Sequence, residues 1–545
     1  MPDPAFEWHP EPELIGTRDE AASRAALERL GVEAWTAALD YLYGEAFRRA
    51  MGVTADYRAL RRAFFGTDRS ADGSSVEPGP GAAPVDPATA DTVLAEFTTR
   101  VAPYQLNAYH PRTLSYFTPP PLVMSVVGEL LAQVTQQGID VWHAGPSGAF
   151  VEEEVIRWLT DLVGYPAPVG GPPTDGTVSA DGAFGLLTSG GVMANLVALT
   201  LVRDVHLPRV ARFDEPPRGR QLEGVRVYAG DQSHFSIGRS LHELGFPSET
   251  LSIIETDDEL RLAPDVLART IDSDRRAGLR PLAIAAVAGS TNTGAIDPIP
   301  ALADLAEKEG LWLHVDAAYG GAVRFSARFA SRVPDLQRAD SVTVDPHKWF
   351  FQAYDIGAVL VRRGRDLLDT FHRSPEYYRG GARHGAEDGG HGSGELNFYQ
   401  LGIEGTRRWR ALKLWLSWKH VGSNGFARLI ESNIDVAAHL AERIRASDDF
   451  EMFPDEPPLS VVCFRHLPEG RAAAAGLDAD GLRALDRHQD RLQLALEESG
   501  EGWLSTTTIR GRSCLRAGIV NYMTTRDDID ELLAILRRLA AGFDS

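Results

Sequence analysis

The sequence predicts an α/β protein in which a mostly parallel sheet carries helices on its faces. Between about residues 180 and 365, short β-rich runs alternate with segments of helical spacing, the pattern of strand-helix-strand units. Polar and glycine-containing stretches follow the ends of several runs, and that edge is where open α/β sheets bind ligands. A shorter mixture of strand-like and helix-like segments closes the chain, which predicts a second, smaller α+β domain.

The predicted elements follow one another in a regular order. Strands are expected at 225–228, 251–254, 282–288, 311–315, 342–344 and 356–361, and helices at 192–203, 236–244, 264–277 and 299–309. Before them, helical spacing covers much of 20–65 and 93–101, and a helix is expected from Val123 toward Trp142. After them, helices are expected at 406–420, 425–444, 481–498 and 527–541, and strands at 459–464 and 514–520.

Length and composition suggest how these elements divide into domains. A chain of 545 residues exceeds one ordinary core. We expect an amino-terminal helical segment over 1–128, a large domain over 129–404 and a small domain over 405–545. Residues 68–86 are rich in Gly, Pro, Ser and Ala, so they are predicted to form a linker.

Charge and cysteine content argue against several classes of function. The net charge of −21 opposes binding to nucleic acid or to an anionic membrane, both of which attract basic patches. The two cysteines, Cys463 and Cys514, form neither a disulfide framework nor a metal motif. The amino-terminal residues lack a signal-peptide pattern, and no apolar stretch reaches membrane-spanning length. A cytoplasmic protein without a bound metal is expected.

The stretch 341–351 contains the first candidate for chemistry. Its alternating apolar residues end at Asp345-Pro346, which places Lys348 at the carboxyl edge of a predicted strand. Trp349 and Phe350 would shield this lysine from water, which weakens its preference for the charged form and makes it a candidate amine nucleophile. The alternative is an ordinary solvated lysine at a strand end.

Four other stretches end predicted strands. Residues 186–195 form a glycine-containing turn that opens a helix, where backbone N–H groups can hold a phosphate; the alternative is a plain helix cap. His234 follows one strand and could equally be a packed residue, and 288–294 is a hydroxyl-rich turn. Asp316 ends an apolar strand, where a carboxylate is costly unless it is paired.

Taken together, these groups match the needs of pyridoxal phosphate. The glycine turn could hold its phosphate, His234 could stack on its ring, and Lys348 could form a Schiff base with it. Asp316 could keep its pyridine nitrogen protonated, which makes the ring an electron sink.

From about residue 105 to the carboxyl end, the sequence resembles the group II pyridoxal-phosphate decarboxylases, the family of aromatic-L-amino-acid and glutamate decarboxylases. The resemblance is carried by Asp345-Pro-His-Lys-Trp349 and His314-Val-Asp-Ala-Ala-Tyr319. Thr188-Ser-Gly-Gly191, Asp231-Gln-Ser-His234 and the 407–415 run Arg-Arg-Trp-Arg-Ala-Leu-Lys-Leu-Trp add to it. It implies a fold-type-I pyridoxal-phosphate enzyme.

The resemblance also implies roles for individual residues. Lys348 matches the Schiff-base lysine, Asp316 the partner of the pyridine nitrogen, and His234 the ring-stacking residue, which also serves catalysis. The remaining expected cofactor contacts are Gly190, Gly191, Val192, Thr291, Ala318 and His347. Many relatives have Asn where this chain has Asp345, whose carboxylate would repel a phosphate unless protonated; His347 is therefore expected beside the phosphate instead.

Tyr377 matches the loop tyrosine that returns a proton to Cα after carbon dioxide leaves in this family. A phenol, with an ordinary pKa of about 10, is protonated at neutral pH and can deliver that proton. The neighbouring Tyr378 is the alternative if the match is displaced by one residue. The glycine-rich run that follows predicts a mobile lid.

The resemblance suggests the substrate and the assembly as well. Tyr116, Phe117 and Pro119 with Trp142 match substrate-pocket positions in relatives, and their aromatic, uncharged character favours an aromatic or other apolar L-amino acid. Arg516 aligns with a residue that contacts the substrate carboxylate in some relatives. An obligate homodimer is also implied.

Four alternatives remain beside decarboxylation of an aromatic amino acid to its amine. The scaffold could carry out an aldehyde-forming oxidative decarboxylation or a retro-aldol cleavage, or it could use a small aliphatic or acidic amino acid. It could also be a binding or regulatory protein without turnover. Phenylalanine at the donor position marks the oxidative relatives, so the tyrosine here favours plain decarboxylation.

Overall fold

The structure, a computed structural model of the chain, describes residues 20–44, 57–65, 88–166, 182–207, 217–372, 397–470 and 474–543. The predicted linker at 68–86 lies outside these residues, as do Tyr377 and its glycine-rich loop. The chain divides into two compact units, and the first comprises 1–113, 492–503 and 535–545. Its amino-terminal part contains α1 (Glu20–Tyr43), α2 (Tyr57–Phe65) and α3 (Ala90–Glu96), which continues as a π-helical turn, Phe97–Val101.

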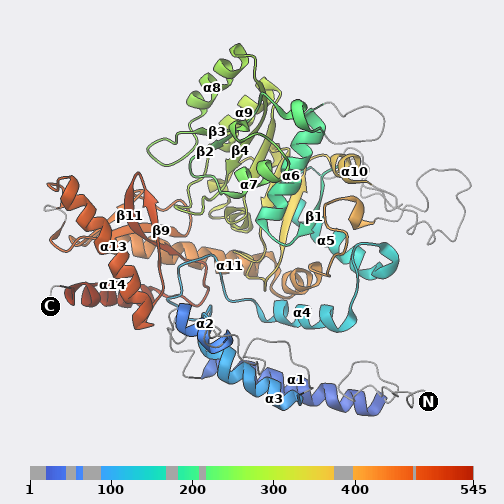
Figure 1. Cartoon of the computed structure of the whole chain (residues 1–545), viewed down its shortest axis with the longest axis vertical. Helices are drawn as coiled ribbons and strands as arrows, with labels where there is room; N and C mark the ends of the chain where they lie inside the picture. Colours follow the sequence, from blue (N-terminus) through green and yellow to red (C-terminus); the bar gives the residue numbers. More distant parts are fainter. Residues whose placement is uncertain are drawn as a thin grey trace, which may run out of the picture. The chain divides into compact units, whose positions relative to one another are not determined.

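The second unit, 114–491 with 504–534, is built on a seven-stranded sheet of order β1-β7-β6-β5-β4-β2-β3 (Figure 1). The strands are β1 (Phe184–Thr188), β2 (Val225–Gly230), β3 (Leu251–Ile254), β4 (Arg280–Val287), β5 (Trp312–Asp316), β6 (Ser341–Val344) and β7 (Gly357–Val361). From β3 to β6 all neighbours are parallel, whereas β7 runs antiparallel to both β6 and β1. The prediction of a mostly parallel sheet flanked by helices is confirmed.

Most helices around this sheet pack on its two faces, whereas α4 (Val123–Thr135) packs against the long helix over 411–445. The other helices are α5 (Pro146–Val163), α6 (Gly191–His206), α7 (Ser236–Glu243), α8 (Pro264–Arg276), α9 (Ile299–Glu309) and α10 (Arg365–Phe371). Prolines at the first turns of α5, α8 and α9 start helices at the position that needs no backbone N–H. Gly164 and Gly310 end α5 and α9 in the left-handed conformation.

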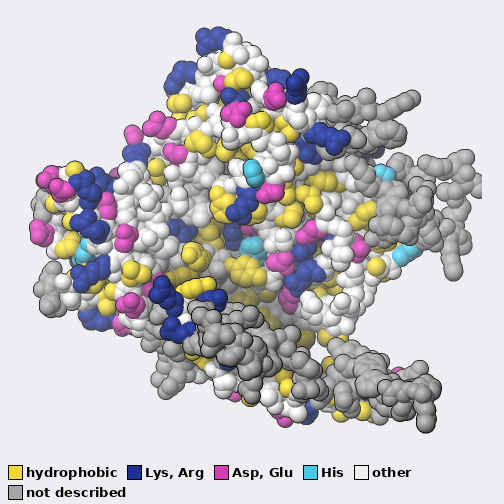
Figure 2. Space-filling view, in the orientation of Figure 1, with side chains coloured by type: hydrophobic (Ala, Val, Ile, Leu, Met, Phe, Trp, Pro, Cys, Tyr) yellow, Lys and Arg dark blue, Asp and Glu magenta, His cyan; other side chains and the backbone are white. Residues whose placement is uncertain are grey.

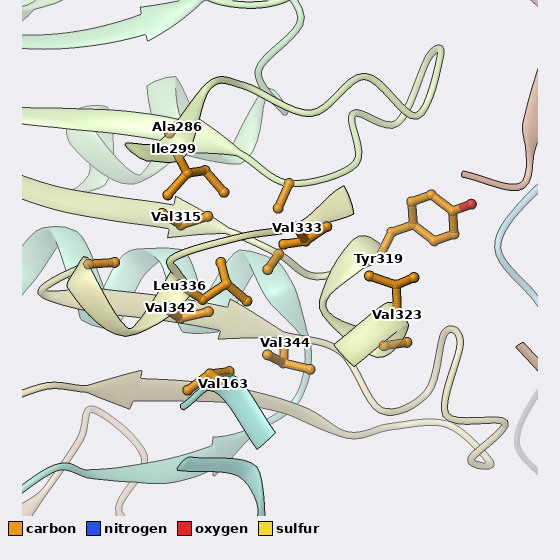
Figure 3. Close-up of a cluster of buried hydrophobic side chains, with 14 of the residues drawn as sticks. Val163, Ala286, Ile299, Val315, Tyr319, Val323, Val333, Leu336, Val342 and Val344 are labelled. Atoms are coloured by element: carbon orange, nitrogen blue, oxygen red, sulfur yellow. The ribbon is translucent and has the colours of Figure 1, made fainter. Parts of the chain in front are cut away.

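Side chains alternate across the sheet, so the core forms two clusters. On β5, Leu313 and Val315 join one cluster with α8 and α9, whereas Trp312 joins the other with α6 and α7. Figure 3 shows Val315 of the first cluster close to Ile299, and Val342 beside Leu336. Alternation therefore turns His314 and Asp316 toward the α6 face.

A second, antiparallel sheet has the order β10-β11-β9-β8. It comprises β8 (Phe450–Phe453), β9 (Val461–His466), β10 (Ser505–Ile509) and β11 (Arg512–Gly518), with α11 (Ala411–Arg445), α13 (Ala479–Ser499) and α14 (Arg526–Ala541) nearby in the sequence. The short β8 and the threonine-rich β10 were not predicted. The two helices expected at 406–420 and 425–444 form one element, α11, interrupted at Gly422, whose φ of 65° and ψ of 169° are not helical.

Most predicted boundaries hold to within a few residues, but the helix expected to reach Trp142 ends at Thr135. Gln136 adopts the left-handed conformation (φ 49°), which ends the hydrogen-bonded ladder. The apolar spacing beyond it therefore belongs to a loop that leads into α5.

The visible surface carries both signs of charge. Figure 2 shows acidic and basic side chains interspersed over this face, with no continuous basic band among the residues it colours. In the described part of the chain, no helix is both long enough and apolar enough to cross a membrane.

Candidate active site

A cavity of about 370 Å³ opens at the carboxyl ends of β1, β2, β4, β5 and β6. Predicted site residues from all five positions line it: Gly190, Gly191, Val192, His234, Thr291, Asp316, Ala318, His347 and Lys348. Because the carboxyl ends of these strands meet at one edge, side chains far apart in the sequence converge there.

The turn between β1 and α6 forms one wall of the cavity. Gly190 has a φ of 153°, and a Cβ built on it would lie 3.0 Å from Cε1 of His347. A Cβ on Gly191 would lie 2.8 Å from Oδ2 of Asp345. Only glycine therefore fits here, and it leaves the first backbone N–H groups of α6 open to an anion.

Lys348 lies in the turn after β6, as predicted. Its Nζ is 3.1 Å from Oδ2 of Asp345, and the exposed fractions of the two side chains are 22% and 2%. The backbone N–H of Asp345 donates to the carbonyl oxygen of Ala318, 3.1 Å away, which fixes this turn against the loop after β5. Oδ1 of Asp345 is buried and accepts no hydrogen bond from any described residue.

His347 lies beside the glycine turn and is held by the backbone. Its Nδ1 accepts a 3.2 Å hydrogen bond from the N–H of Ile356, and its Nε2 is 3.7 Å from Oδ2 of Asp345. Burial lowers the pKa of His347, and the nearby Asp345 opposes that effect only in part. The imidazole is therefore neutral at neutral pH and reaches the cavity as a hydrogen-bonding group.

Asp316 and His234 enter the cavity from neighbouring elements. Oδ1 of Asp316 accepts from the backbone N–H of Ala318 at 3.1 Å, and Oδ2 accepts from Nδ2 of Asn195 at 2.8 Å. Two N–H donors stabilise the negative charge of this almost buried carboxylate. Nδ1 of His234 is 2.8 Å from the hydroxyl of Ser236, and burial lowers the pKa of His234.

His314 lies one alternation before Asp316 on the same face of β5 and is fully buried. Its ring nitrogens are 2.9 Å from Oγ of Ser341 and 3.0 Å from Oδ1 of Asn195. Burial lowers the pKa of His314 to about 4. Between pH 4 and pH 6.5, therefore, the ring of His314 stays neutral in the folded chain but is protonated in the unfolded chain.

This difference predicts a loss of stability in acid. Since the folded pKa of His314 is below the unfolded value of about 6.5, its contribution is complete above pH 6.5 and is lost as the pH falls toward 4. Between pH 7.5 and pH 5 the loss from this residue should be about 2 kcal/mol. Unfolding free energies measured at both pH values should therefore fall less for His314→Gln than for the parent. An equal fall in both proteins would contradict the assignment.

The substrate-pocket residues expected from the resemblance do not all meet at the cavity. The ring of Phe117 is 6.0 Å from Nζ of Lys348, and it stacks on Tyr319, which lines the cavity. Trp142 packs against the second core cluster, and its backbone N–H donates to Oδ1 of Asn397. Tyr116 is largely exposed, and neither it nor Pro119 lines the cavity.

Arg516, on β11, lies against the ring of Phe117. Its Cζ is 4.8 Å from that ring, and its Nε donates to the carbonyl oxygen of Thr291 at 2.8 Å. Nη2 is buried, and none of the described residues accepts a hydrogen bond from it. Burial lowers the pKa of Arg516.

A buried ion pair holds the edge strand that carries the glycine turn. Nη2 of Arg407 is 2.5 Å from Oε1 of Glu152, and the exposed fractions of the two side chains are 1% and 0%. Glu152 accepts from the N–H of Leu187 at 3.1 Å, and Arg407 donates to the carbonyl oxygen of the same residue at 2.6 Å. β1 is an edge strand with a neighbouring strand on one side only. On its other side, Glu152 and Arg407 supply the backbone hydrogen bonds that a further strand would have made with Leu187.

Comparison with known proteins identifies the family. The conserved domain of pyridoxal-dependent decarboxylases matches residues 74–467. The chain is also 34% identical to an aromatic-L-amino-acid decarboxylase of Bacillus atrophaeus, over 79% of this chain and 81% of that one. The chain belongs to the pyridoxal-dependent decarboxylases. It is an amino-acid decarboxylase, a carbon-carbon lyase whose cofactor is pyridoxal 5'-phosphate.

Other members of the pyridoxal-dependent decarboxylases differ in substrate. An L-2,4-diaminobutyrate decarboxylase of Acinetobacter baumannii is 27% identical over 79% of this chain and 80% of that one. The crystal structure of mouse CSAD superposes with a TM-score of 0.80 at 23% identity, covering 95% of this chain and 99% of that one, which confirms the fold.

The residues of this decarboxylase fit pyridoxal phosphate. The wall at Gly190 and Gly191 has no room for a Cβ but offers the amino-terminal end of α6, as a phosphate requires. The carboxylate of Asp316 suits a protonated ring nitrogen, and the amine of Lys348 shares the cavity. When bound, the cofactor supplies a ring that accepts the electrons of the broken Cα–carboxylate bond.

Sequence reasoning did not single out Asn195, Ser236, Glu152 or Arg407, each of which bonds to a wall of the site. Asn195 and Arg407 lie within motifs that carry the resemblance or mark the glycine turn, but no role was inferred for them. A pattern on the neighbouring strand could have indicated a role for Asn195. Trp312, His314 and Asp316 alternate along buried β5, so three side chains that form hydrogen bonds lie on one of its faces. Polar groups there require a polar partner on the covering helix.

Proposed function

We propose that this decarboxylase acts on an aromatic L-amino acid and releases the amine and carbon dioxide. The observation that carries the proposal is one cavity holding the amine of Lys348 and the carboxylate of Asp316, with the rings of Phe235 and Tyr319 among its lining. Phe117 stacks on Tyr319 with ring centroids 4.2 Å apart, and Tyr319 stacks on Trp349 at 4.9 Å. Of these three rings Tyr319 lines the cavity and the other two support it, and an aromatic lining favours a flat apolar side chain over a charged one.

Each lining group has a proposed task. Lys348 attaches the cofactor through its amine, Asp316 pairs with the ring nitrogen, and His234 lies against the ring. The glycine turn holds the phosphate with help from His347, while Val192, Thr291 and Ala318 line the remaining walls. The contacts that support this assignment are those of the cavity itself.

The substrate's carboxylate also needs a partner before it leaves. Nη2 of Arg516 is buried and bonds to no described residue, but Arg516 does not line the cavity, so its contact with that carboxylate is proposed from the resemblance. A tight clamp would stabilise the ground state as much as the transition state, so Arg516 serves orientation rather than rate. Tyr116, Pro119 and Trp142 belong to this proposal only through the resemblance, because none of them lines the cavity.

A substrate panel tests the proposed function. The full chain, with pyridoxal 5'-phosphate added, is incubated with each of the twenty amino acids, with L-2,4-diaminobutyrate and without substrate, and the products are identified by mass spectrometry. Amine and carbon dioxide from phenylalanine, tyrosine or tryptophan support the proposal. Turnover of diaminobutyrate or of an acidic amino acid alone would overturn the aromatic assignment.

Tyr377, which lies outside the described residues, is the proposed proton donor to Cα. Tyr377→Phe should lower amine formation by about 10²-fold or more, since a positioned acid contributes roughly that much. Molecular oxygen can then oxidise the substrate with consumption of one water, so that aldehyde, ammonia, hydrogen peroxide and carbon dioxide appear together. Tyr378→Phe is the matched control and should leave the products unchanged. Unaltered amine formation in Tyr377→Phe, or the same change in Tyr378→Phe, would remove Tyr377 from this role.

We further infer that the chain acts as a homodimer in a reducing cytoplasm. Helix α4 exposes large apolar side chains, with Val123 at 72% and Leu130 at 64% exposed, which supports an interface. Cys463 and Cys514 are free and buried, which supports a reducing compartment. Analytical ultracentrifugation should give twice the mass of one chain.

A further inference from the structure

Asn195, in the first turns of α6, has no task in the proposed function, yet its side chain joins four others. Its Nδ2 donates to Oδ2 of Asp316 and to Oγ of Ser236, each at 2.8 Å. Its Oδ1 accepts from Nε2 of His314 at 3.0 Å and from the hydroxyl of Thr343 at 2.7 Å. The carboxamide is fully buried, and all four of its hydrogen-bonding positions are used.

The carboxylate of Asp316 fixes the direction of the bonds on one side of this network. An ionised carboxylate only accepts, so the amide atom that faces it must be the nitrogen of Asn195. The amide oxygen then faces His314, whose Nε2 must carry the proton. Since His314 is neutral, its Nδ1 accepts from the hydroxyl of Ser341, and that hydroxyl accepts from Nε1 of Trp312 at 2.8 Å.

The orientation of the Asn195 amide also fixes the hydrogen bonds of Ser236 and His234. Because Oγ of Ser236 accepts from Asn195, the hydroxyl hydrogen of Ser236 is free to go to Nδ1 of His234, 2.8 Å away. The backbone N–H of Ser236 points at the same nitrogen from 3.3 Å. Nδ1 of His234 thus faces two donors, and the proton of the neutral ring lies on Nε2.

We propose that Asn195 is a positioning residue that sets the protonation pattern of two groups lining the cavity. It holds Asp316 as a carboxylate that only accepts hydrogen bonds, and it holds His234 as the Nε2–H tautomer. The tasks of Asp316 and His234 rest on the proposed function, whereas the pattern itself rests on the hydrogen bonds of Asn195.

The variant Asn195→Asp reverses the direction of the second branch. The introduced carboxyl group faces the carboxylate of Asp316 across the same contact, so the two groups share one proton. The hydroxyl of Ser236 then supplies the only remaining hydrogen and turns to donate to the introduced oxygen. Nδ1 of His234 then loses a donor, faces a hydroxyl oxygen that can accept, and takes up a proton.

The measurement is ¹⁵N NMR of the full chain labelled at histidine, recorded with and without added pyridoxal 5'-phosphate. The chain has 15 histidines, so the signals of His234 are assigned by their loss in His234→Gln. The parent should show a protonated Nε2 and an unprotonated Nδ1, and Asn195→Asp should show a protonated Nδ1. A parent with Nδ1 protonated, or an unchanged pattern in Asn195→Asp, would overturn the proposal. The parent spectrum decides even if the variant does not fold.

Thr343→Val is the matched control. It removes one hydrogen bond from the same amide oxygen at nearly constant volume, but it leaves Asn195 held by His314 and Asp316. The chain should lose about 1–3 kcal/mol of unfolding free energy, the usual cost of disrupting a buried hydrogen bond, while the His234 pattern stays that of the parent. If Thr343→Val also moves the His234 proton to Nδ1, a non-specific loosening of the structure around the network explains the effect, and the proposal fails.

Kinetics separate this inference from the proposed function. In the cofactor-loaded protein, Asn195→Asp should lower kcat by about 10–100-fold, the usual cost of removing an outer partner of a site group, with little change in KM. Thr343→Val should lower it by less than about threefold, and an equal loss in both variants would contradict a specific role for Asn195. If the parent releases no amine, the proposed function fails, and the NMR pattern still decides the inference.

Discussion

Replacing Lys348 by alanine is expected to reduce amine formation by about 10⁴-fold or more, the scale of losing a covalent catalytic group. The amine lies in the cavity 3.1 Å from Asp345, and no other lysine lines that cavity within the described residues. The measurement is carbon dioxide release from the substrate found in the panel, with pyridoxal 5'-phosphate in excess.

A surface lysine provides the control for this prediction. Lys308→Ala removes a largely exposed amine on α9, remote from the cavity lining, and should leave the rate within twofold of the parent. The far-ultraviolet circular dichroism of Lys348→Ala should match that of the parent, which excludes misfolding. Turnover by Lys348→Ala at the native rate would remove this residue from the mechanism and with it the proposed function.

Arg407→Met is expected to cost about 3–5 kcal/mol of unfolding free energy, because it leaves the carboxylate of Glu152 buried without its cation. The substitution should also loosen the glycine turn, because Arg407 bonds to the backbone of Leu187 close to that turn. The dissociation constant for pyridoxal phosphate should therefore rise. Urea unfolding and a fluorescence titration with the cofactor measure the two effects.

Two further variants identify the cause of the stability lost in Arg407→Met. Arg365→Met breaks an exposed pair with Asp369 and should change stability by less than about 0.5 kcal/mol. Combining Arg407→Met with Glu152→Leu removes both buried charges and should recover part of the lost stability. A double variant no more stable than Arg407→Met would show that the cost comes from packing instead of from the unpaired carboxylate.

The periodicity of the sequence predicted the large sheet well. Runs such as 251–254 and 342–344 are apolar and short, and each is followed by a helix or a polar turn, so their placement needed only local information. Site residues at strand ends, such as Asp316 and Lys348, followed from the same reasoning, because strand direction decides which edge they share.

What the sequence could not supply depends on contacts between distant segments. Glu152 and Arg407 meet across an edge strand from positions 255 residues apart, and neither sits in a local pattern that indicates the other. Likewise, the rotation of α6 over the sheet decides that Asn195 reaches Asp316. Helix ends were also missed where an ordinary residue, Gln136, adopts a left-handed conformation that glycine usually fills.

The antiparallel strand β7 has a consequence for how this chain can vary. It begins at Gly357, where a Cβ would lie 2.5 Å from Cα of Gly190 and 2.7 Å from Oδ1 of Asp345, so one backbone position packs against both the glycine turn and Asp345. The connection from Lys348 to Gly357 buries Trp349, Phe350 and Phe351, so an inserted residue would have to displace core side chains or shift the register of β7. A one-residue shift would turn Val359 to the opposite face of the sheet. The length of that connection is thus constrained by the core on one side and by the sheet on the other.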